Sequence, residues 1–187
     1  ERMDLSEIRN NRFCLPDAEA AKAAEIYLDQ KIAECDSVGG VVECVISGLP
    51  VGLGEPVFEK LDANLAKAIL SIGAVKGFEI GDGFAATKAC GSDNNDEFRM
   101  NGDKIVKETN HAGGVLGGIS DGSDVVFRAA FKPTPSIAKS QETVTKDGEN
   151  IDLVIHGRHD PVVVPRAVVV VESMAAITAM DMLLVSM

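Results

Sequence analysis

The chain has 187 residues, 45% of them hydrophobic and 25% charged, which is enough apolar material for a globular core and excludes a disordered chain. Its 18 Lys and Arg against 29 Asp and Glu give a formal net charge of −11, which argues against general attraction to nucleic acid or to an anionic membrane surface. Any anionic ligand therefore needs a local cluster of cations. We expect one globular unit, or two small intertwined ones, and take residues 1–187 as a single unit.

The first half of the sequence predicts two helices and two strands. A helix should begin after Asp17, with its apolar residues on one buried stripe, and end at the DSVGG segment, residues 36–40. A strand follows over 41–48, then a second helix over roughly 57–72 that Gly73 ends, then a short strand that enters an Asp-Gly turn at 82–83. The stripe residues are Ala20, Ala24, Tyr27, Leu28 and Ile32 in the first helix, and Leu61, Leu65, Ala68, Ile69 and Ile72 in the second.

The second half predicts a polar loop over 91–98, strands over 124–131 and 151–156, and a last helix that opens near Pro165 and runs to the C-terminus. Four consecutive valines at 168–171 weaken that helix prediction, since β-branched residues favour strands. Residues 162–187 have the hydropathy of a membrane span but contain Arg166, Glu172 and Asp181. We therefore expect a buried helix and no membrane partner.

The four cysteines lack any C-x-x-C pair or nearby histidine, so we expect reduced, buried thiols and no metal site. Reduced thiols are typical of the cytoplasm. The charged first ten residues lack the apolar core of a signal peptide, which favours the same compartment.

Three polar clusters lie outside the predicted core. The glycine-rich stretch at 110–122 matches neither a P-loop nor a dinucleotide fingerprint, and a plain irregular turn explains it better than a ligand does. The KPTPS stretch at 132–136 offers one ammonium and two hydroxyls on a loop stiffened by prolines, which suits a phosphate monoester. A solvated proline-rich loop explains it equally well.

The third cluster is GRHD at 157–160. Arg158 can bind a carboxylate or phosphate through two parallel hydrogen bonds, and His159 and Asp160 can move protons or hold the arginine. The alternative is a helix N-terminus that Asp160 caps, with His159 on the surface.

Four stretches in series resemble the C-terminal half of chorismate synthase, from about Arg12 nearly to the end of the chain. They are DSVGGVVECVISGLPVGLGEPVFEKLDANLAKAILSIGAVKGFEIGDGF, NHAGGVLGGISDG, FKPTPSI and GRHDPVVVPRAVVVVESMAA. The family's N-terminal half, with its GESHG-type motif, a further acid–base histidine and several substrate-binding arginines, has no counterpart here. The resemblance therefore implies a fragment, with an α+β fold in which helices are sandwiched with antiparallel β-sheet.

The resemblance implies a lyase of the shikimate pathway, in aromatic amino acid biosynthesis. It would convert 5-enolpyruvylshikimate 3-phosphate to chorismate and phosphate by anti-1,4-elimination with reduced FMN. Whether a separate reductase or an intrinsic activity with NADPH reduces the flavin stays open. Asp160 matches an aspartate near the flavin that is suspected of helping proton transfer, whereas His111 is expected to be structural, His159 stays open and His156 has no assigned role. The matched flavin-binding positions are Gly73, Ala74, Gly117, Lys132, Pro133, Thr134, Pro135, Ser136 and Arg158.

Two functions remain in view from the sequence. One is the flavin-binding half of a cytoplasmic chorismate synthase that forms a homotetramer, and the other is a non-catalytic flavin-binding or oligomerisation module. The substrate is multiply anionic and the reduced flavin is an anion beside it, so Lys132 and Arg158 are too few cations to hold both. We therefore expect no turnover from these 187 residues alone.

Overall fold

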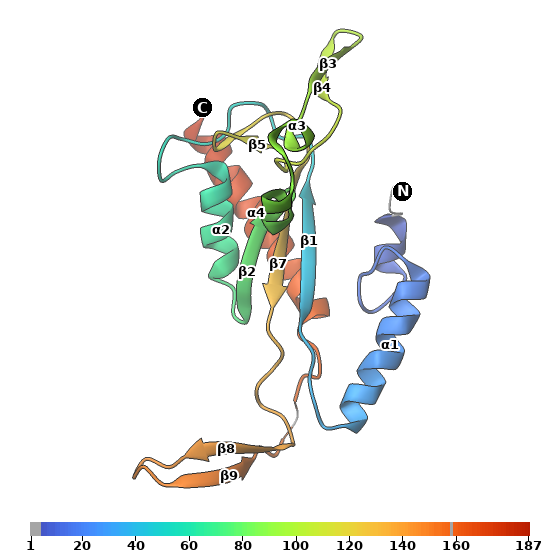
Figure 1. Ribbon diagram of the computed structural model, residues 1–187, viewed down its shortest axis with the longest axis vertical. Coiled ribbons are helices and arrows are strands. Elements are labelled where there is room, and N and C mark those ends of the chain that lie inside the picture. The colour runs from blue at the N-terminus through green and yellow to red at the C-terminus, as the bar shows by residue number, and fades with distance from the viewer. Residues whose placement is uncertain (1–4, 158) are drawn as a thin grey trace. The chain divides into compact units, whose positions relative to one another are not determined.

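The computed structural model describes residues 5–157 and 159–187 (Figure 1). The chain divides into two compact units. Unit 1 consists of residues 1–40 and 131–168, and unit 2 of residues 41–130 and 169–187. Each unit is described by itself below. The single unit expected from the sequence stays a prediction, because one domain can contain two compact units.

Unit 2 is built on a three-stranded sheet in the order β1 (Gly40–Ile46), β7 (Val125–Phe131), β2 (Val75–Ile80); the first residue of β1 and the last residue of β7 belong to unit 1. Two helices, α2 (Leu61–Leu70) and α4 (Val164–Val185), lie against this sheet (Figure 1). The first turn of α4, up to residue 168, belongs to unit 1. Strand β7 alternates buried and half-buried residues along its length, as a strand with one face on a core must. The principal buried side chains of unit 2 are Val42, Leu53, Leu61, Leu65, Ile69, Val75, Val125, Phe127, Ala129, Val171, Ala175, Ala179 and Met182.

Helix α2 has a strictly buried stripe. Leu61, Leu65 and Ile69 recur every four residues and are fully buried, so these positions were correctly predicted. The helix begins at Leu61, not near 57, because Val57 has a φ of +66°, outside the helical region, and the Glu55 N–H closes a turn on the Glu59 carbonyl.

Helix α4 forms despite its valines, because tertiary packing outweighs their local preference. The prediction of a buried helix was wrong in one respect: only one face is buried, while Val169, Val170, Ile177, Met180 and Leu184 are exposed. By length and composition alone α4 could also cross a membrane, and it is the one helix in the described part of the chain that meets this test.

Three antiparallel hairpins complete the strands: β3 (Phe98–Asn101) with β4 (Lys104–Lys107), β5 (Val115–Leu116) with β6 (Ile119–Ser120), and β8 (Ser140–Val144) with β9 (Asn150–Val154). The sequence analysis missed β3, β4, β5, β6 and β8, although Asn101-Gly102 is a strong hairpin signal. The predicted polar loop over 91–98 is also interrupted, since α3 (Gly91–Asn94) occupies its start. Two short 3-10 helices, η1 (Leu5–Arg9) and η2 (Gly83–Lys88), also occur in the described part of the chain.

Unit 1 contains α1 (Ala18–Ala33) and the β8–β9 hairpin. Asp17 caps α1 as predicted, because its carboxylate accepts hydrogen bonds from the Glu19 and Ala20 N–H groups. The predicted buried stripe was largely wrong: Ala21 and Leu28 are buried, whereas Tyr27 and Ile32 are exposed. Most side chains of β8 and β9 are exposed as well.

The mixture of helices and antiparallel hairpins confirms the predicted α+β class. All four cysteines are free, but they are not buried as expected. Cys35 and Cys90 are exposed, and Cys14 and Cys44 are half-buried.

Candidate functional site

The predicted phosphate-binding residues form one loop of unit 1. Residues 132–136 follow directly after β7 and carry an exposed Lys132 ammonium with the half-buried Thr134 and Ser136. Two prolines restrict the backbone of this loop. Its carbonyls receive two side-chain hydrogen bonds from other parts of the unit: Ser37 Oγ donates to Thr134 O over 2.7 Å, and Gln141 Nε2 donates to Pro135 O over 3.0 Å.

Asp160 lies elsewhere in unit 1, on a turn before α4, and is half-buried. Its carboxylate forms an ion pair with Arg166, on the first turn of α4. The neighbouring His159 has its Nε2 3.1 Å from the Ile155 carbonyl, which gives this ring a local structural contact. Arg158, predicted to bind the flavin, lies outside the described residues.

A cavity of about 240 Å³ in unit 1 brings Asp160 together with residues from two other segments. The sequence analysis missed the contribution of residues 35–37 to this cavity, and no local motif could have revealed it, because the segments are more than 90 residues apart. The lining consists of Ile32, Cys35, Asp36, Ser37, Ile137, Ala138, His159, Asp160 and Pro161.

The remaining predicted positions belong to unit 2. Gly73 and Ala74 connect α2 to β2, and Ala74 has a φ of +71°, a conformation that residues other than glycine seldom adopt. Gly117 is exposed in the two-residue turn between β5 and β6, with a φ of +61°, and no atom lies within 4 Å of where its Cβ would be. A ligand can therefore approach the Gly117 backbone closely.

Other glycines of the same stretch have a packing role. A Cβ on Gly113 would lie 2.3 Å from the Gly81 backbone nitrogen, so this glycine permits the close approach of two chain segments. The plain-turn interpretation therefore accounts for Gly113, whereas Gly117 remains available to a ligand.

A buried ion cluster holds the start of this glycine-rich stretch. Lys107 Nζ lies 3.2 Å from Asp96 Oδ2 and 2.7 Å from Asp121 Oδ2, and all three side chains are at most 6% exposed. Asp96 also accepts hydrogen bonds from the His111 and Ala112 N–H groups and from the Thr109 hydroxyl. The cluster therefore ties the base of the β3–β4 hairpin to residues 110–121.

Hydrogen bonding outweighs burial in this cluster. Burial by itself raises the pKa of Asp96. The hydrogen bonds that Asp96 accepts lower this pKa by more than burial raises it, so the pKa lies well below its ordinary value. Burial likewise raises the pKa of Asp121, while Lys107 and Ser123 lower it below normal overall. His111 Nδ1 lies 3.0 Å from Asp96 Oδ1, but it is buried without a hydrogen bond of acceptable geometry among the described residues. These contacts make His111 part of a structural cluster.

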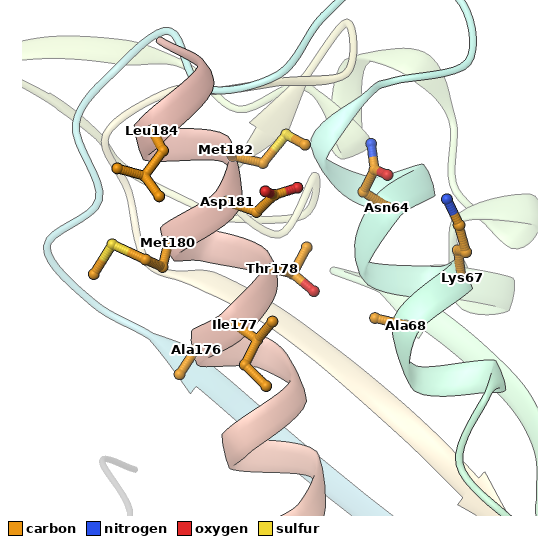
Figure 2. Close-up of a pocket in the computed structure, with 10 residues that line it drawn as sticks. All are labelled: Asn64, Lys67, Ala68, Ala176, Ile177, Thr178, Met180, Asp181, Met182 and Leu184. Carbon is orange, nitrogen blue, oxygen red and sulfur yellow. The ribbon is translucent and has the colours of Figure 1, made fainter. Parts of the chain in front are cut away.

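A separate open groove of about 720 Å³ lies between α2 and α4 in unit 2 (Figure 2). Its walls combine apolar side chains of α4 with polar ones such as Lys67 and Asp181, and none of the predicted site residues lines it. The labelled residues are Asn64, Lys67, Ala68, Ala176, Ile177, Thr178, Met180, Asp181, Met182 and Leu184.

The predicted site residues thus fall into two groups. The 132–136 loop and Asp160 belong to unit 1, and Gly73, Ala74 and Gly117 belong to unit 2. Their roles in binding flavin stay predictions.

Comparison with known proteins gives a consistent family. The family model for chorismate synthase matches residues 2–184. A protein named chorismate synthase from Agathobacter rectalis is 65% identical over 184 residues, which are 98% of this chain and 50% of that protein. One of the same name from Lachnoclostridium phytofermentans is 65% identical over 176 residues, 94% of this chain and 48% of that protein.

A solved structure agrees with these sequence matches. A crystal structure of chorismate synthase matches this fold with a TM-score of 0.81 at 31% identity, covering 98% of this chain and 48% of that one. The chain spans about half the length of the curated relatives it matches. A family match over nearly the whole chain, with this identity and this fold, means that the chain belongs to the chorismate synthase family.

Proposed function

We propose that this chain supplies the flavin-binding part of a chorismate synthase, which eliminates phosphate from 5-enolpyruvylshikimate 3-phosphate to form chorismate. The observation that carries the proposal is the 132–136 loop, where an exposed ammonium and two hydroxyls lie on a backbone restricted by prolines. These groups suit the phosphate of FMN.

The residues present fit such a phosphate. No carboxylate of the described residues pairs with Lys132, and neither the Thr134 nor the Ser136 hydroxyl bonds to another described residue, so all three can serve a ligand. Lys132 would neutralise a phosphate oxygen while the hydroxyls donate to the others. Gly117, in unit 2, is a separate family-based candidate for ligand approach to the backbone, because no atom lies within 4 Å of where its Cβ would be. When bound, reduced FMN would lend an electron transiently and assist removal of the ring proton.

Asp160 is the group we propose for proton transfer. Its carboxylate borders the 240 Å³ cavity and is paired with Arg166, so its acceptor oxygens have a defined orientation. In this role Asp160 would accept or hold a proton at Oδ near the reacting ring. NADPH as the reductant of the flavin remains part of the proposal.

Titration of FMN into the 187-residue chain, followed by flavin fluorescence, tests the proposal. We expect saturable binding that Lys132→Ala weakens by about tenfold or more, because a charge-assisted hydrogen bond is lost. Lys146→Ala is the matched control, since Lys146 is an exposed lysine in the β8–β9 turn of the same unit. Equal effects of the two substitutions, or no binding by a folded chain, would contradict the proposal.

A non-catalytic module is the second candidate, favoured by the coverage of only half of the relatives' length. The substrate and flavin together carry more negative charge than Lys132 and Arg158 can neutralise. We therefore expect that the 187 residues alone form no chorismate, and that adding the family's missing half restores turnover. Chorismate production by the purified chain would refute this expectation.

For partners and location we propose a cytoplasmic homotetramer that binds neither nucleic acid nor membrane. The exposed apolar side chains of α4, such as Ile177 and Leu184, favour burial against protein. The exposed free thiols of Cys35 and Cys90 suit a reducing compartment. The net charge of −11 disfavours polyanions. Sedimentation equilibrium, which measures the assembled mass, tests the tetramer.

A further inference from the structure

We infer that the segment 36–39, between α1 and β1, positions both functional parts of unit 1, the 132–136 loop and the Asp160 turn, and that Ser37 and Gly39 are its positioning residues. The inference rests on the proposed function, because it assigns the loop to flavin phosphate. It concerns residues that precede the predicted site by more than 90 positions in the chain.

Ser37 holds the centre of the loop. Its Oγ donates a 2.7 Å hydrogen bond to the carbonyl of Thr134, one of the proposed phosphate-binding residues. The loop lies outside any helix or strand, so contacts of this kind determine its conformation. Loss of this donor would leave the half-buried Thr134 carbonyl without this partner and the loop with fewer contacts to restrain it.

Gly39 holds the start of the loop by its lack of a side chain. A Cβ at this position would lie 2.3 Å from the Phe131 carbonyl oxygen and 3.1 Å from the Pro133 backbone nitrogen. Both are backbone atoms, so they cannot move away as a flexible side chain could. Any larger residue must therefore displace the end of β7 and the first residues of the loop.

Val38, which lies between Ser37 and Gly39, holds the turn that carries Asp160. The Val38 N–H donates a 2.8 Å hydrogen bond to the Pro161 carbonyl, and Val38 forms a parallel β-bridge with Val162. Pro161 directly follows Asp160, so this bridge restrains the backbone that carries the proposed proton-transfer residue.

A salt bridge and a shared cavity extend this arrangement. Lys139 Nζ lies 2.6 Å from Asp36 Oδ2, which ties the residues just after the loop to the start of the same segment. Ser37 and Asp160 line the same 240 Å³ cavity. One short segment therefore contacts the beginning and the centre of the loop, the residues just after it, and also the turn that carries Asp160.

Two measurements on the 187-residue chain test the inference: FMN affinity, and hydrogen–deuterium exchange of residues 131–139 without flavin. We expect Ser37→Ala to weaken FMN binding by about 3- to 10-fold, the value of one neutral hydrogen bond, and to speed exchange in the loop. Ser37→Thr keeps the hydroxyl and should remain within about twofold of the unaltered chain. Gly39→Ala should weaken binding by about tenfold or more, because backbone must move.

The matched controls are Ser140→Ala and Gly91→Ala. Ser140 is exposed in unit 1 with no side-chain hydrogen bond to a described residue, and a Cβ on Gly91 would meet no atom within 4 Å. Both should leave FMN affinity and loop exchange unchanged. If Gly39→Ala fails to fold by circular dichroism, the Ser37 series alone decides.

The outcomes separate the inference from the proposed function. The inference would be overturned if Ser37→Ala left hydrogen–deuterium exchange in the loop unchanged, or if it sped that exchange without altering FMN affinity. In either case, weaker FMN binding by Lys132→Ala would still support the proposed function. If the folded, unaltered chain binds no FMN, the proposed function fails and the flavin part of the inference fails with it. The exchange data then still decide whether the segment restrains the loop.

Discussion

Unit 2 and unit 1 are stabilised in different ways. Unit 2 buries a continuous set of aliphatic and aromatic side chains between its sheet and α2 and α4, and adds the buried Lys107 cluster. Unit 1 buries few apolar side chains, such as Leu28 and Phe131, and its loops are held by individual hydrogen bonds and by the close contact at Gly39. Regions held by few buried contacts open at lower free energy. The proposed phosphate loop is therefore in the unit that depends most on single polar contacts.

The largest effect should come from the ion cluster of unit 2. Lys107→Ala leaves Asp96 and Asp121 buried without their cation, and we expect a loss of about 3–5 kcal/mol in the free energy of unfolding. Urea denaturation measures it. Lys104→Ala, at an exposed lysine of the same hairpin, should change stability by less than about 0.5 kcal/mol. If both substitutions lowered the free energy of unfolding by similar amounts, the buried cluster would not be a main source of stability in unit 2.

The apolar core of unit 2 should give the next largest effect. Leu65 is 0% exposed on α2, so Leu65→Ala should lower the free energy of unfolding by about 2–5 kcal/mol. Leu70, on the same helix, is 50% exposed, and Leu70→Ala should lower it by less than about 1 kcal/mol. Both values come from urea denaturation, and a Leu70 effect as large as that of Leu65 would contradict the assigned packing.

Acid should destabilise unit 2 through the same cluster. The pKa values of Asp96 and Asp121 are lowered in the folded chain, so the unfolded chain takes up protons first as the pH falls. The stabilisation is complete above the ordinary carboxyl pKa of about 4 and is lost as the pH falls from there through the lowered values. Unfolding in urea between pH 7 and pH 3 measures this loss. In Lys107→Ala the free energy of unfolding should fall less steeply as the pH decreases. A flat profile in the unaltered chain would contradict the lowered pKa values.

The last and smallest expected difference between the two units is in the reactivity of their thiols, and it involves no change in stability. Burial raises the pKa of Cys44 in unit 2 to about 11, with a contribution from Glu172, so little thiolate exists at neutral pH. Cys35 in unit 1 is exposed and should react with a maleimide faster than Cys44. Mass spectrometry of the labelled peptides at pH 7 gives the order. Cys44 reacting as fast as Cys35 would mean that this part of unit 2 opens readily.

Much of the fold could be predicted because its signals are local. The four-residue spacing of Leu61, Leu65 and Ile69 predicted the buried face of α2, and Asp17 predicted the start of α1. The buried stripe of α1 was wrong because helical spacing says which residues share a face but not whether another element covers it.

Less of the candidate site could be predicted. Family resemblance identified the 132–136 loop and Asp160, but not the segment that holds them. Ser37 and Thr134 are 97 residues apart, and nothing near either residue predicts their hydrogen bond. The Lys107 cluster was missed for the same reason, since its two aspartates come from different polar loops.

By itself the sequence determined the family, the α+β class and the positions of the main helices and of the three strands of the central sheet, because motifs and hydrophobic spacing are properties of neighbouring residues. Only the tertiary structure decided that α4 buries one face, that Lys107 bridges two buried carboxylates and that residues 36–39 contact the 132–136 loop. Each of these depends on contacts between distant segments, whose energies arise only when the chain has folded.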